Sequence, residues 1–171
     1  GLFLGRNGKF ERITKDFPDE AVISLTLDSE SNLWLGTVNR ATGAVSDIGA
    51  TGFGRLASIA FRPDGVLFAS AEGRLWIVDP SSAAITEIGV TGLREASLAF
   101  DASGDLFAAA DNRLWSVNTI TAAITDIGVT GFGNFTNFNM PTIAFDSDGI
   151  LFAAAGNRLM TMDPTTGTPT D

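Results

Sequence analysis

The chain has 171 residues, of which 44% are hydrophobic and 18% charged, a composition typical of a globular protein rather than a disordered one. The formal net charge of −9 opposes binding to nucleic acid, which needs a basic surface, and docking on anionic membranes. Cysteine and histidine are both absent, which excludes thiol catalysis and cysteine-bound metals and removes the commonest general base. No apolar run approaches the roughly 20 residues of a membrane-spanning helix, so we expect no membrane insertion.

The first part of the chain predicts strands whose pattern differs from the rest. An alternating strand (24–27) is followed by an acidic turn (28–31) and by the strand NLWLGT (32–37). Residues 17–37 thereby resemble the two-component-regulator propeller repeat, which implies a β-propeller fold. Residues 1–16 before them predict only part of a blade.

The spacing inside this first blade differs from that of the later repeats. Leu27 lies 34 residues before its equivalent, Phe61, whereas Asp47 lies 40 residues before Glu87. About six residues are therefore missing, which is roughly the length of one strand. We expect a shortened or distorted blade.

From about residue 40 the chain repeats with a period near 40 residues. The stretches ITEIGVTGL (85–93) and ITDIGVTGF (124–132) are nearly identical. Each repeat predicts short strands separated by turns of Asp, Asn, Ser and Gly, and four such strands per repeat are typical of a propeller blade. The predicted strands are 58–61, 66–71, 74–79 and 84–89; then 97–100, 106–110, 113–118 and 123–128; then 142–145, 150–155 and 158–163.

These later repeats resemble the NHL and gluconolactonase-like bacterial propeller repeats, a resemblance that implies a fold and no shared activity. The predicted fold class is all-β, a β-propeller of four-stranded antiparallel blades, with about four to five blades in this chain. We expect a single propeller domain or propeller segment over residues 1–171. Its predicted parts are a partial blade (1–16), a shortened blade (17–53), two blades (54–92 and 93–131) and a blade with a loop insertion (132–171).

Both ends of the chain interrupt the repeat. The chain begins with Gly rather than Met, and we interpret it as a processed or excised segment of a longer protein. At the other end, a further blade is expected to begin at TPTD (168–171). Four to five blades either close as a small ring or form part of a larger one. In the second case, exposed blade edges are expected to pair with another chain or a second copy.

The loop at residues 131–141 is six residues longer than its equivalent near 92–96 and alternates Phe with Asn. In propeller topology it shares a face with the turns between second and third strands, where propellers usually bind. Aromatic and amide side chains suit a sugar, a peptide or another subunit; the alternative is a loop that packs its Phe residues over the blade. The candidate binding residues are Phe132, Asn134, Phe135, Asn137, Phe138 and Asn139, with Asp111 and Asn157 in the turns.

The recurring charged residues favour structural roles. Acidic turns could hold Ca²⁺, with Asp146 and Asp148 as the weak candidate, but Asp and Gly are first of all turn formers. No other cofactor and no catalytic residue is expected. The acids of the fourth strands are interpreted as solvated edge charges, the arginines of the third strands as salt-bridge or packing residues, and the Trp residues as core. These are Asp47, Glu87 and Asp126; Arg74, Arg113 and Arg158; and Trp34, Trp76 and Trp115.

The sequence therefore favours a non-catalytic propeller scaffold that binds a protein partner, a ligand or itself, within a larger extracytoplasmic protein or assembly. One alternative is a periplasmic ligand-sensing domain, suggested by residues 17–37. A lactonase or lyase-type propeller enzyme is disfavoured, because the first strands present small residues such as Ser97 and Ala99 where such enzymes place histidines or acids.

Overall fold

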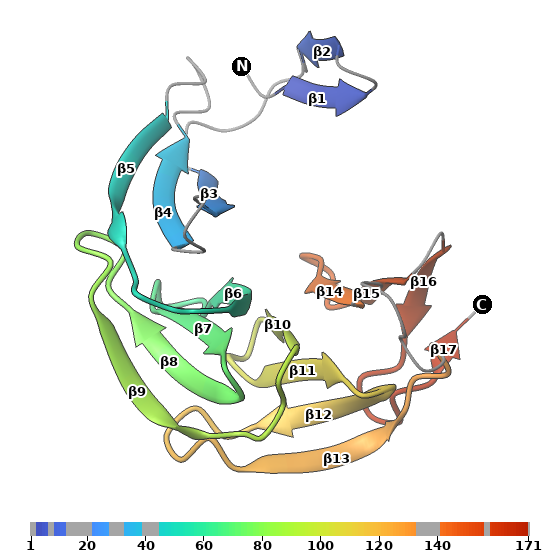
Figure 1. Cartoon of the computed structure of the whole chain (residues 1–171). Helices are drawn as coiled ribbons and strands as arrows, with labels where there is room; N and C mark the ends of the chain where they lie inside the picture. The colour runs from blue at the N-terminus through green and yellow to red at the C-terminus, as the bar shows by residue number, and fades with distance from the viewer. Residues whose placement is uncertain are drawn as a thin grey trace. The chain divides into compact units, whose positions relative to one another are not determined.

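The computed structural model describes residues 3–6, 9–12, 22–27, 33–38, 45–132, 141–155 and 158–170, with side chains from residue 48 onward. The chain divides into two compact units. The first comprises residues 1–52 with 80–83, and the second comprises residues 53–79 with 84–171. Every regular element assigned in the described residues is a β-strand (Figure 1).

The first unit contains five strands in the described residues. β1 (Phe3–Arg6) and β2 (Lys9–Arg12) pair as an antiparallel hairpin. β3 (Val22–Leu27), β4 (Leu33–Val38) and β5 (Val45–Ala50) form a three-stranded antiparallel sheet.

The described part of the second unit forms three antiparallel sheets of four strands each, and in each sheet the strand order follows the chain. The first sheet is β6 (Leu56–Phe61), β7 (Leu67–Ala71), β8 (Arg74–Val78) and β9 (Ile85–Val90). The second is β10 (Ser97–Phe100), β11 (Leu106–Ala110), β12 (Arg113–Val117) and β13 (Ile124–Val129). The third is β14 (Thr142–Phe145), β15 (Leu151–Ala155), β16 (Arg158–Met162) and β17 (Pro169–Thr170).

The last strand corrects one expectation. Pro169 and Thr170 do not begin a further blade, because β17 pairs with β16 through Met162 opposite Pro169 and Thr161 opposite Thr170. The turn after Asp163 reverses the chain, since the backbone N–H of Gly167 donates to the Asp163 carbonyl at 2.8 Å. Pro169 is tolerated there because β17 is an edge strand, where a missing N–H disturbs no further pairing.

The three sheets stack face to face, with β10 beside β6 on one side and beside β14 on the other (Figure 1). One apolar cluster joins the first and second sheets, and another joins the second and third. We call the side of each sheet that points to the next sheet along the chain its forward face. In the second sheet it carries Ala99, Ala109 and Leu114, which belong to the second cluster, and Phe107, which packs against it.

The forward faces pack as the small and aromatic residues of the repeat predict. Alanines such as Ala109 are fully buried where the sheets approach one another, which is the role expected of small side chains there. Aromatic pairs fill the wider space: the ring centroids of Phe68 and Phe100 are 5.1 Å apart, and those of Phe107 and Phe145 are 5.2 Å apart. Both pairs are tilted, a favourable geometry for aromatic rings.

The first glycine of the repeated stretch DIGVTG (126–131) is required by packing. A Cβ atom on Gly128 would lie 2.0 Å from the carbonyl oxygen of Thr166, in the turn before β17. Gly89 approaches the carbonyl of Thr121 in the same way, at 3.0 Å. The fourth strands of the first and second sheets thus lie directly against a turn of the next sheet. A Cβ atom would collide with that turn at Gly128 and be crowded by it at Gly89.

Candidate functional site

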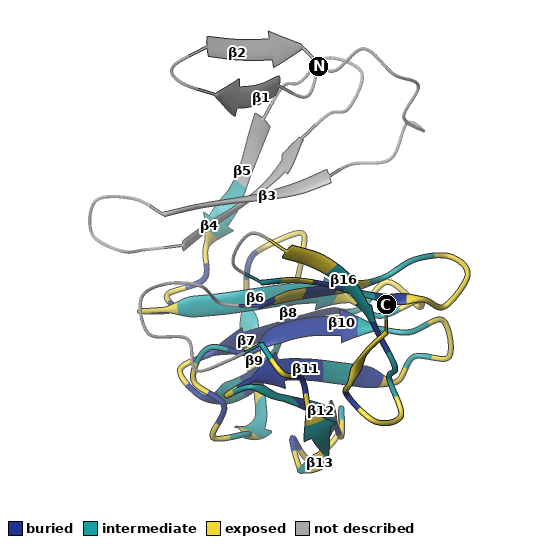
Figure 2. Cartoon of the chain, turned by 90° about the vertical axis from the view of Figure 1, so that its right-hand side faces the viewer, coloured by how far each residue is buried: buried dark blue, intermediate teal, exposed yellow. Residues whose placement is uncertain are grey.

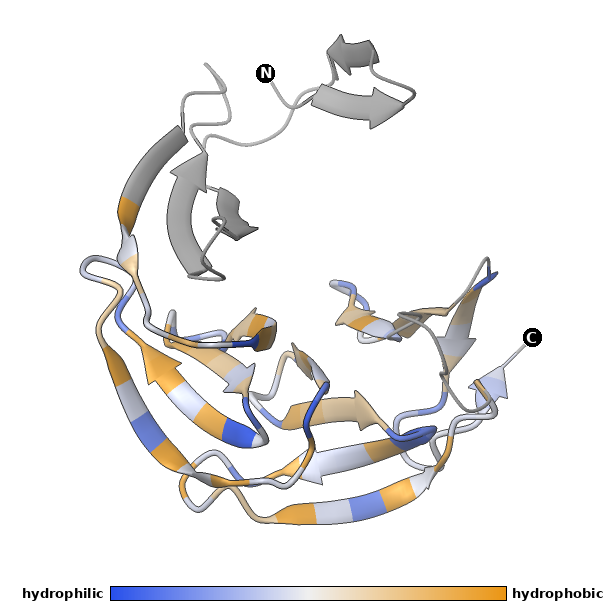
Figure 3. Ribbon diagram, in the orientation of Figure 1, coloured by the Kyte–Doolittle hydropathy of each residue, from blue (hydrophilic) through white to orange (hydrophobic). Residues whose placement is uncertain are grey.

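In the first and second sheets, the recurring arginine and acid of each sheet pair with one another. Arg74 forms a salt bridge with Glu87, and Arg113 forms one with Asp126. Figure 3 shows hydrophilic bands across the strands that carry them. The predicted salt-bridge role of these arginines is therefore confirmed, and both acids are pairing partners in addition to edge charges. Arg158 is exposed, and the side chain of Asp47 lies outside the described residues.

The tryptophans contribute to packing, as predicted for Trp115, which packs against the first apolar cluster. Trp76 contacts Phe53 edge to face, with ring centroids 5.4 Å apart. Each of these two indole N–H groups donates to a backbone carbonyl at 3.3 Å, so the polar tip of each ring is satisfied. The side chain of Trp34 lies outside the described residues.

The acidic turns use their carboxylates to hold the backbone. Asp146 Oδ1 accepts from the N–H groups of Asp148 and Ile150, at 2.9 and 2.8 Å. Asp101 Oδ1 accepts from Ser103 and Asp105 at the same two distances. In the described part of the chain, no three carboxylates gather as metal ligands. The geometry at Asp146 is that of a turn former.

The end of the sheets that carries the fourth-to-first-strand loops has a charged hollow of about 370 Å³, which we call the loop hollow. Glu72 Oε1 accepts from the backbone N–H of Gly54 at 3.1 Å, so the turn after β7 is tied to the loop that enters β6. A salt bridge between Arg55 and Glu95 joins the loops of two successive sheets. The loop hollow is lined by Arg55, Glu72, Arg94 and Glu95.

Two of the predicted binding residues lie in the described part of the chain, and they have different environments. Asp111 is exposed in the turn between β11 and β12, with a positive φ of 52°. Phe132 is half-buried and packs against the cluster between the second and third sheets, as the packing alternative predicted for the loop. The others lie outside the described residues: Asn134, Phe135, Asn137, Phe138, Asn139 and Asn157.

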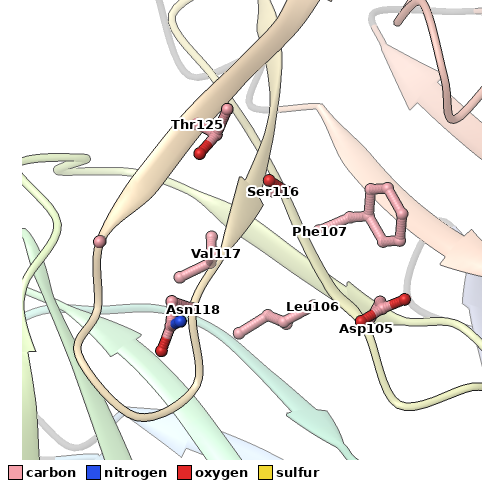
Figure 4. A pocket seen from close by; sticks show the side chains of 8 residues that line it. Asp105, Leu106, Phe107, Ser116, Val117, Asn118 and Thr125 are labelled. Atoms are coloured by element: carbon pink, nitrogen blue, oxygen red, sulfur yellow. The ribbon is translucent and has the colours of Figure 1, made fainter.

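A second hollow, of about 490 Å³, lies at the opposite ends of the strands of the second sheet, and we call it the turn hollow. The strand register places Phe107, Ser116 and Thr125 in one row across β11, β12 and β13. Figure 4 shows Asp105 and Phe107 next to each other at one side, and Asn118 and Thr125 at the other. The lining residues are Asp105, Leu106, Phe107, Ser116, Val117, Asn118, Ala123 and Thr125.

No motif in the sequence predicts either hollow. Three residues of the loop hollow lie in short loops that contain no recognisable motif: Arg55, Arg94 and Glu95. For the turn hollow a signal was present: Asp105 and Ser116 replace Val66 and Ile77 of the preceding repeat, two apolar residues that pack against the first cluster.

The comparisons with known proteins agree on the fold. Residues 16–39 match the family model described as "Two component regulator propeller", which confirms the resemblance of residues 17–37. The chain is also similar to solved propeller structures, at 13–16% sequence identity. The fold is a β-propeller. The four-stranded antiparallel blades predicted from the sequence are thereby confirmed.

Three of these structures show the extent of the similarity. A chain of the nidogen/laminin complex has 13% identity and a TM-score of 0.59 over 95% of this chain and 69% of that one. An auxiliary nutrient binding protein from Bacteroides ovatus ATCC 8483 has 13% identity and a TM-score of 0.55 over 85% and 40%. A protein assigned as a gluconolactonase has 16% identity and a TM-score of 0.54 over 85% and 60%.

These similarities establish the fold and not an activity. The chain spans about 40% of the length of the nutrient binding protein and 60% of that of the gluconolactonase-type protein. No curated protein matches the sequence. Among the described residues, no helix has the length and hydropathy needed to cross a bilayer.

Proposed function

We propose that this chain is a non-catalytic propeller scaffold that assembles with a second copy through the forward face of its third sheet. The recurring polar residues have structural roles, since Arg–acid pairs form in the first and second sheets and carboxylates hold the turns. It also gives a function to an apolar surface that the repeat normally buries. Placement in an extracytoplasmic assembly is part of the same proposal.

One observation carries it: the exposure of Leu159. This leucine occupies the same position in β16 as Leu75 in β8 and Leu114 in β12, both of which are fully buried by the next sheet. Leu159 is 72% exposed. Figure 2 accordingly shows β11 largely buried and part of β16 exposed.

The residues around Leu159 repeat the composition of a buried forward face. Ala144 and Ala154 are exposed, whereas their equivalents Ala99 and Ala109 are 5% and 0% exposed. An exposed face made of residues that elsewhere bury a neighbouring sheet is typical of a protein-protein contact. A further sheet of the same repeat type fits it, and a second copy would supply one.

Sedimentation equilibrium tests the proposal. We expect a species heavier than the 17.9 kDa monomer at micromolar concentration, and its return to monomer mass in a Leu159→Glu variant. The matched control is Ile120→Glu, because Ile120 is 83% exposed in a turn away from this face. A wild-type protein that remains monomeric at all concentrations would refute the proposal.

A second candidate function is a ligand-sensing propeller domain, favoured by the family match of residues 16–39 and by the loop hollow. In this case a small anionic ligand would pair with the cations Arg55 and Arg94. We would expect such a ligand to raise the melting temperature of the wild type and to lose this effect in Arg94→Ala. Equal stabilisation of the two proteins would reject the loop hollow as the sensing site.

A further inference from the structure

At the turn hollow, polar residues of the second sheet replace apolar residues of the first sheet. In the first sheet, Val66 and Ile77 pack against the cluster shared with the second sheet. Their equivalents, Asp105 and Ser116, line an open hollow instead. Two apolar side chains are thus replaced by a carboxylate and a hydroxyl at the same junction, one sheet further along the chain.

The first sheet also shows which group fits beside the central aromatic ring. Arg62 places its guanidinium carbon 5.3 Å from the centroid of the Phe68 ring, a cation–π distance. Two hydrogen bonds to Asp64, at 2.9 and 2.7 Å, hold the guanidinium there. Its stem passes along Gly104, about 3.8 Å from the position of a Cβ atom on that glycine. With this cover and that of Phe100, Phe68 is only 1% exposed.

Phe107 is the equivalent of Phe68 and lacks such a cation. The residue at the place of Arg62 is Asp101, whose carboxylate holds the turn before β11. Phe107 is half-buried rather than fully buried, and it lines the turn hollow beside Asp105 (Figure 4). Within the described part of the chain, Asp105 takes part in no ion pair.

We propose that the turn hollow binds a guanidinium group supplied by a ligand, stacked on Phe107 and paired with the carboxylate of Asp105. The planar cation would lie over the Phe107 ring as the Arg62 guanidinium lies over the Phe68 ring. The hydroxyls of Ser116 and Thr125 lie in the same row as Phe107 and can accept its remaining N–H groups. Asp105 is the only charged residue among those that line the hollow, and the net charge of −9 favours the approach of a cation.

A guanidinium can come from a small molecule or from an arginine side chain in a peptide. The chemistry of recognition is the same, so the experiment includes both sources. This site lies at the opposite end of the sheets from the loop hollow and does not include Leu159, so it is independent of the proposed assembly.

An NMR titration of ¹⁵N-labelled protein in 0.15 M salt tests the site, with ethylguanidinium and the peptide acetyl-Gly-Arg-Gly-amide as probes. Ethylurea is the neutral control of the same shape. We expect amide shifts at Asp105, Phe107 and Ser116 with both cationic probes and none with ethylurea. Tenfold tighter binding of the peptide would indicate a protein segment as the source, and equal affinity would indicate a small molecule. Shifts centred on the loop hollow, or an equal response to ethylurea, would overturn the proposal.

Two variants distinguish binding at the turn hollow from a general attraction of cations to the acidic protein. Asp105→Asn is expected to weaken the binding of ethylguanidinium about tenfold. Glu72→Gln removes one negative charge at the opposite end of the sheets and should leave binding unchanged. An equal loss in both variants would reduce the effect to the charge of the whole protein and would overturn the proposal.

A graft gives the sharpest test. Asp101→Arg with Ser103→Asp copies the pair Arg62–Asp64 into the second sheet, so that the chain's own guanidinium covers Phe107. The new carboxylate at position 103 can hold the turn, because Asp64 Oδ1 accepts from the backbone N–H of Val66 at 3.3 Å. We expect this folded variant to lose ethylguanidinium binding. Binding as strong as in the wild type would overturn the proposal.

Discussion

At the scale of single residues, a serine hydroxyl joins consecutive sheets. Ser58 Oγ accepts from the backbone N–H of Leu98 at 3.0 Å, and Ser97 Oγ accepts from that of Ile143 at 3.1 Å. Both serines lie in first strands, where the sequence shows small residues such as Ser97 and Ala99. The small side chain therefore has a definite role, which is to accept a hydrogen bond from the next blade.

Replacing Ser97 with Ala should destabilise the protein by about 1–3 kcal/mol, because the buried N–H of Ile143 loses its acceptor. Urea denaturation measures the free energy of unfolding. Ser103→Ala is the matched control, since Ser103 is exposed in a turn and should change stability by less than about 0.5 kcal/mol. Equal stabilities of the two variants would show that the inter-sheet bond contributes nothing.

Asp163 offers a test of local electrostatics. The hydroxyl and the backbone N–H of Thr165 both donate to Asp163 Oδ1 at 2.7 Å, and these bonds, the hydroxyl's first, lower the pKa of the carboxyl below its ordinary value. A lowered folded-state pKa stabilises the protein at pH values above the ordinary aspartate pKa. This contribution is lost as the pH falls through the folded-state value.

We expect Thr165→Val to raise the pKa of Asp163 toward its ordinary value, because the valine keeps the shape and removes the hydroxyl donor. Carboxyl-detected NMR titration measures the pKa of this residue directly. Thr170→Val is a control, since the Thr170 hydroxyl bonds to Thr161 and not to Asp163. An unchanged Asp163 pKa in Thr165→Val would assign the shift to the backbone N–H groups and the Thr166 hydroxyl.

The aspartates also show how far sequence alone can predict a site. Asp146 was correctly favoured as a turn former, because its offset from the following Gly defines a turn regardless of the fold. Asp105 lies between the predicted strands 97–100 and 106–110, so the sequence predicts a turn residue there as well. Its place beside Phe107 depends on the pairing of three strands and on which sheet face packs against the next blade. Neither can be predicted from the local pattern of residues.

At the scale of elements, the equivalent leucines Leu114 and Leu159 show how much stability a neighbouring sheet contributes by burying this position. Leu114 is fully buried between the second and third sheets, and Leu159 is 72% exposed. Leu114→Ala should lower the free energy of unfolding by about 2–5 kcal/mol, the usual range for a buried leucine. Leu159→Ala should lower it by less than about 0.5 kcal/mol in dilute, monomeric protein.

Chemical denaturation at two protein concentrations checks this pair. If the cost of Leu159→Ala rises with concentration, the leucine becomes buried on association. If Leu159→Ala costs as much as Leu114→Ala at the lowest concentration, the forward face of the third sheet is already covered within one chain. That result would contradict its exposure.

Most strands followed from the sequence to within a residue or two, because period-two alternation and turn residues are local signals. The fourth strand of the third sheet did not. Pro169–Thr170 has no apolar alternation, and it is a strand only because Thr161 and Met162 of β16 lie opposite it. A strand defined by its partner rather than by its own pattern cannot be recognised before the sheet is known.

At the scale of the whole molecule, net charge and apolar surface act in opposite directions on assembly. Two copies that each carry −9 repel one another, whereas the face around Leu159 attracts through apolar burial. Salt screens the repulsion between exposed charges, with a screening length that falls from about 30 Å at 0.01 M to about 8 Å at 0.15 M. It affects the apolar contact far less.

We therefore expect self-association to strengthen as NaCl rises from about 0.02 to 0.3 M, by roughly a factor of ten in the association constant. Sedimentation velocity at fixed protein concentration measures it. An interface made of ion pairs, such as contacts from Arg55 or Arg94 to acids of the partner copy, would weaken over the same range. The direction of the salt effect thus separates an apolar face from a charged one. Association that weakens with salt, or that survives Leu159→Glu, would move the interface away from the third sheet.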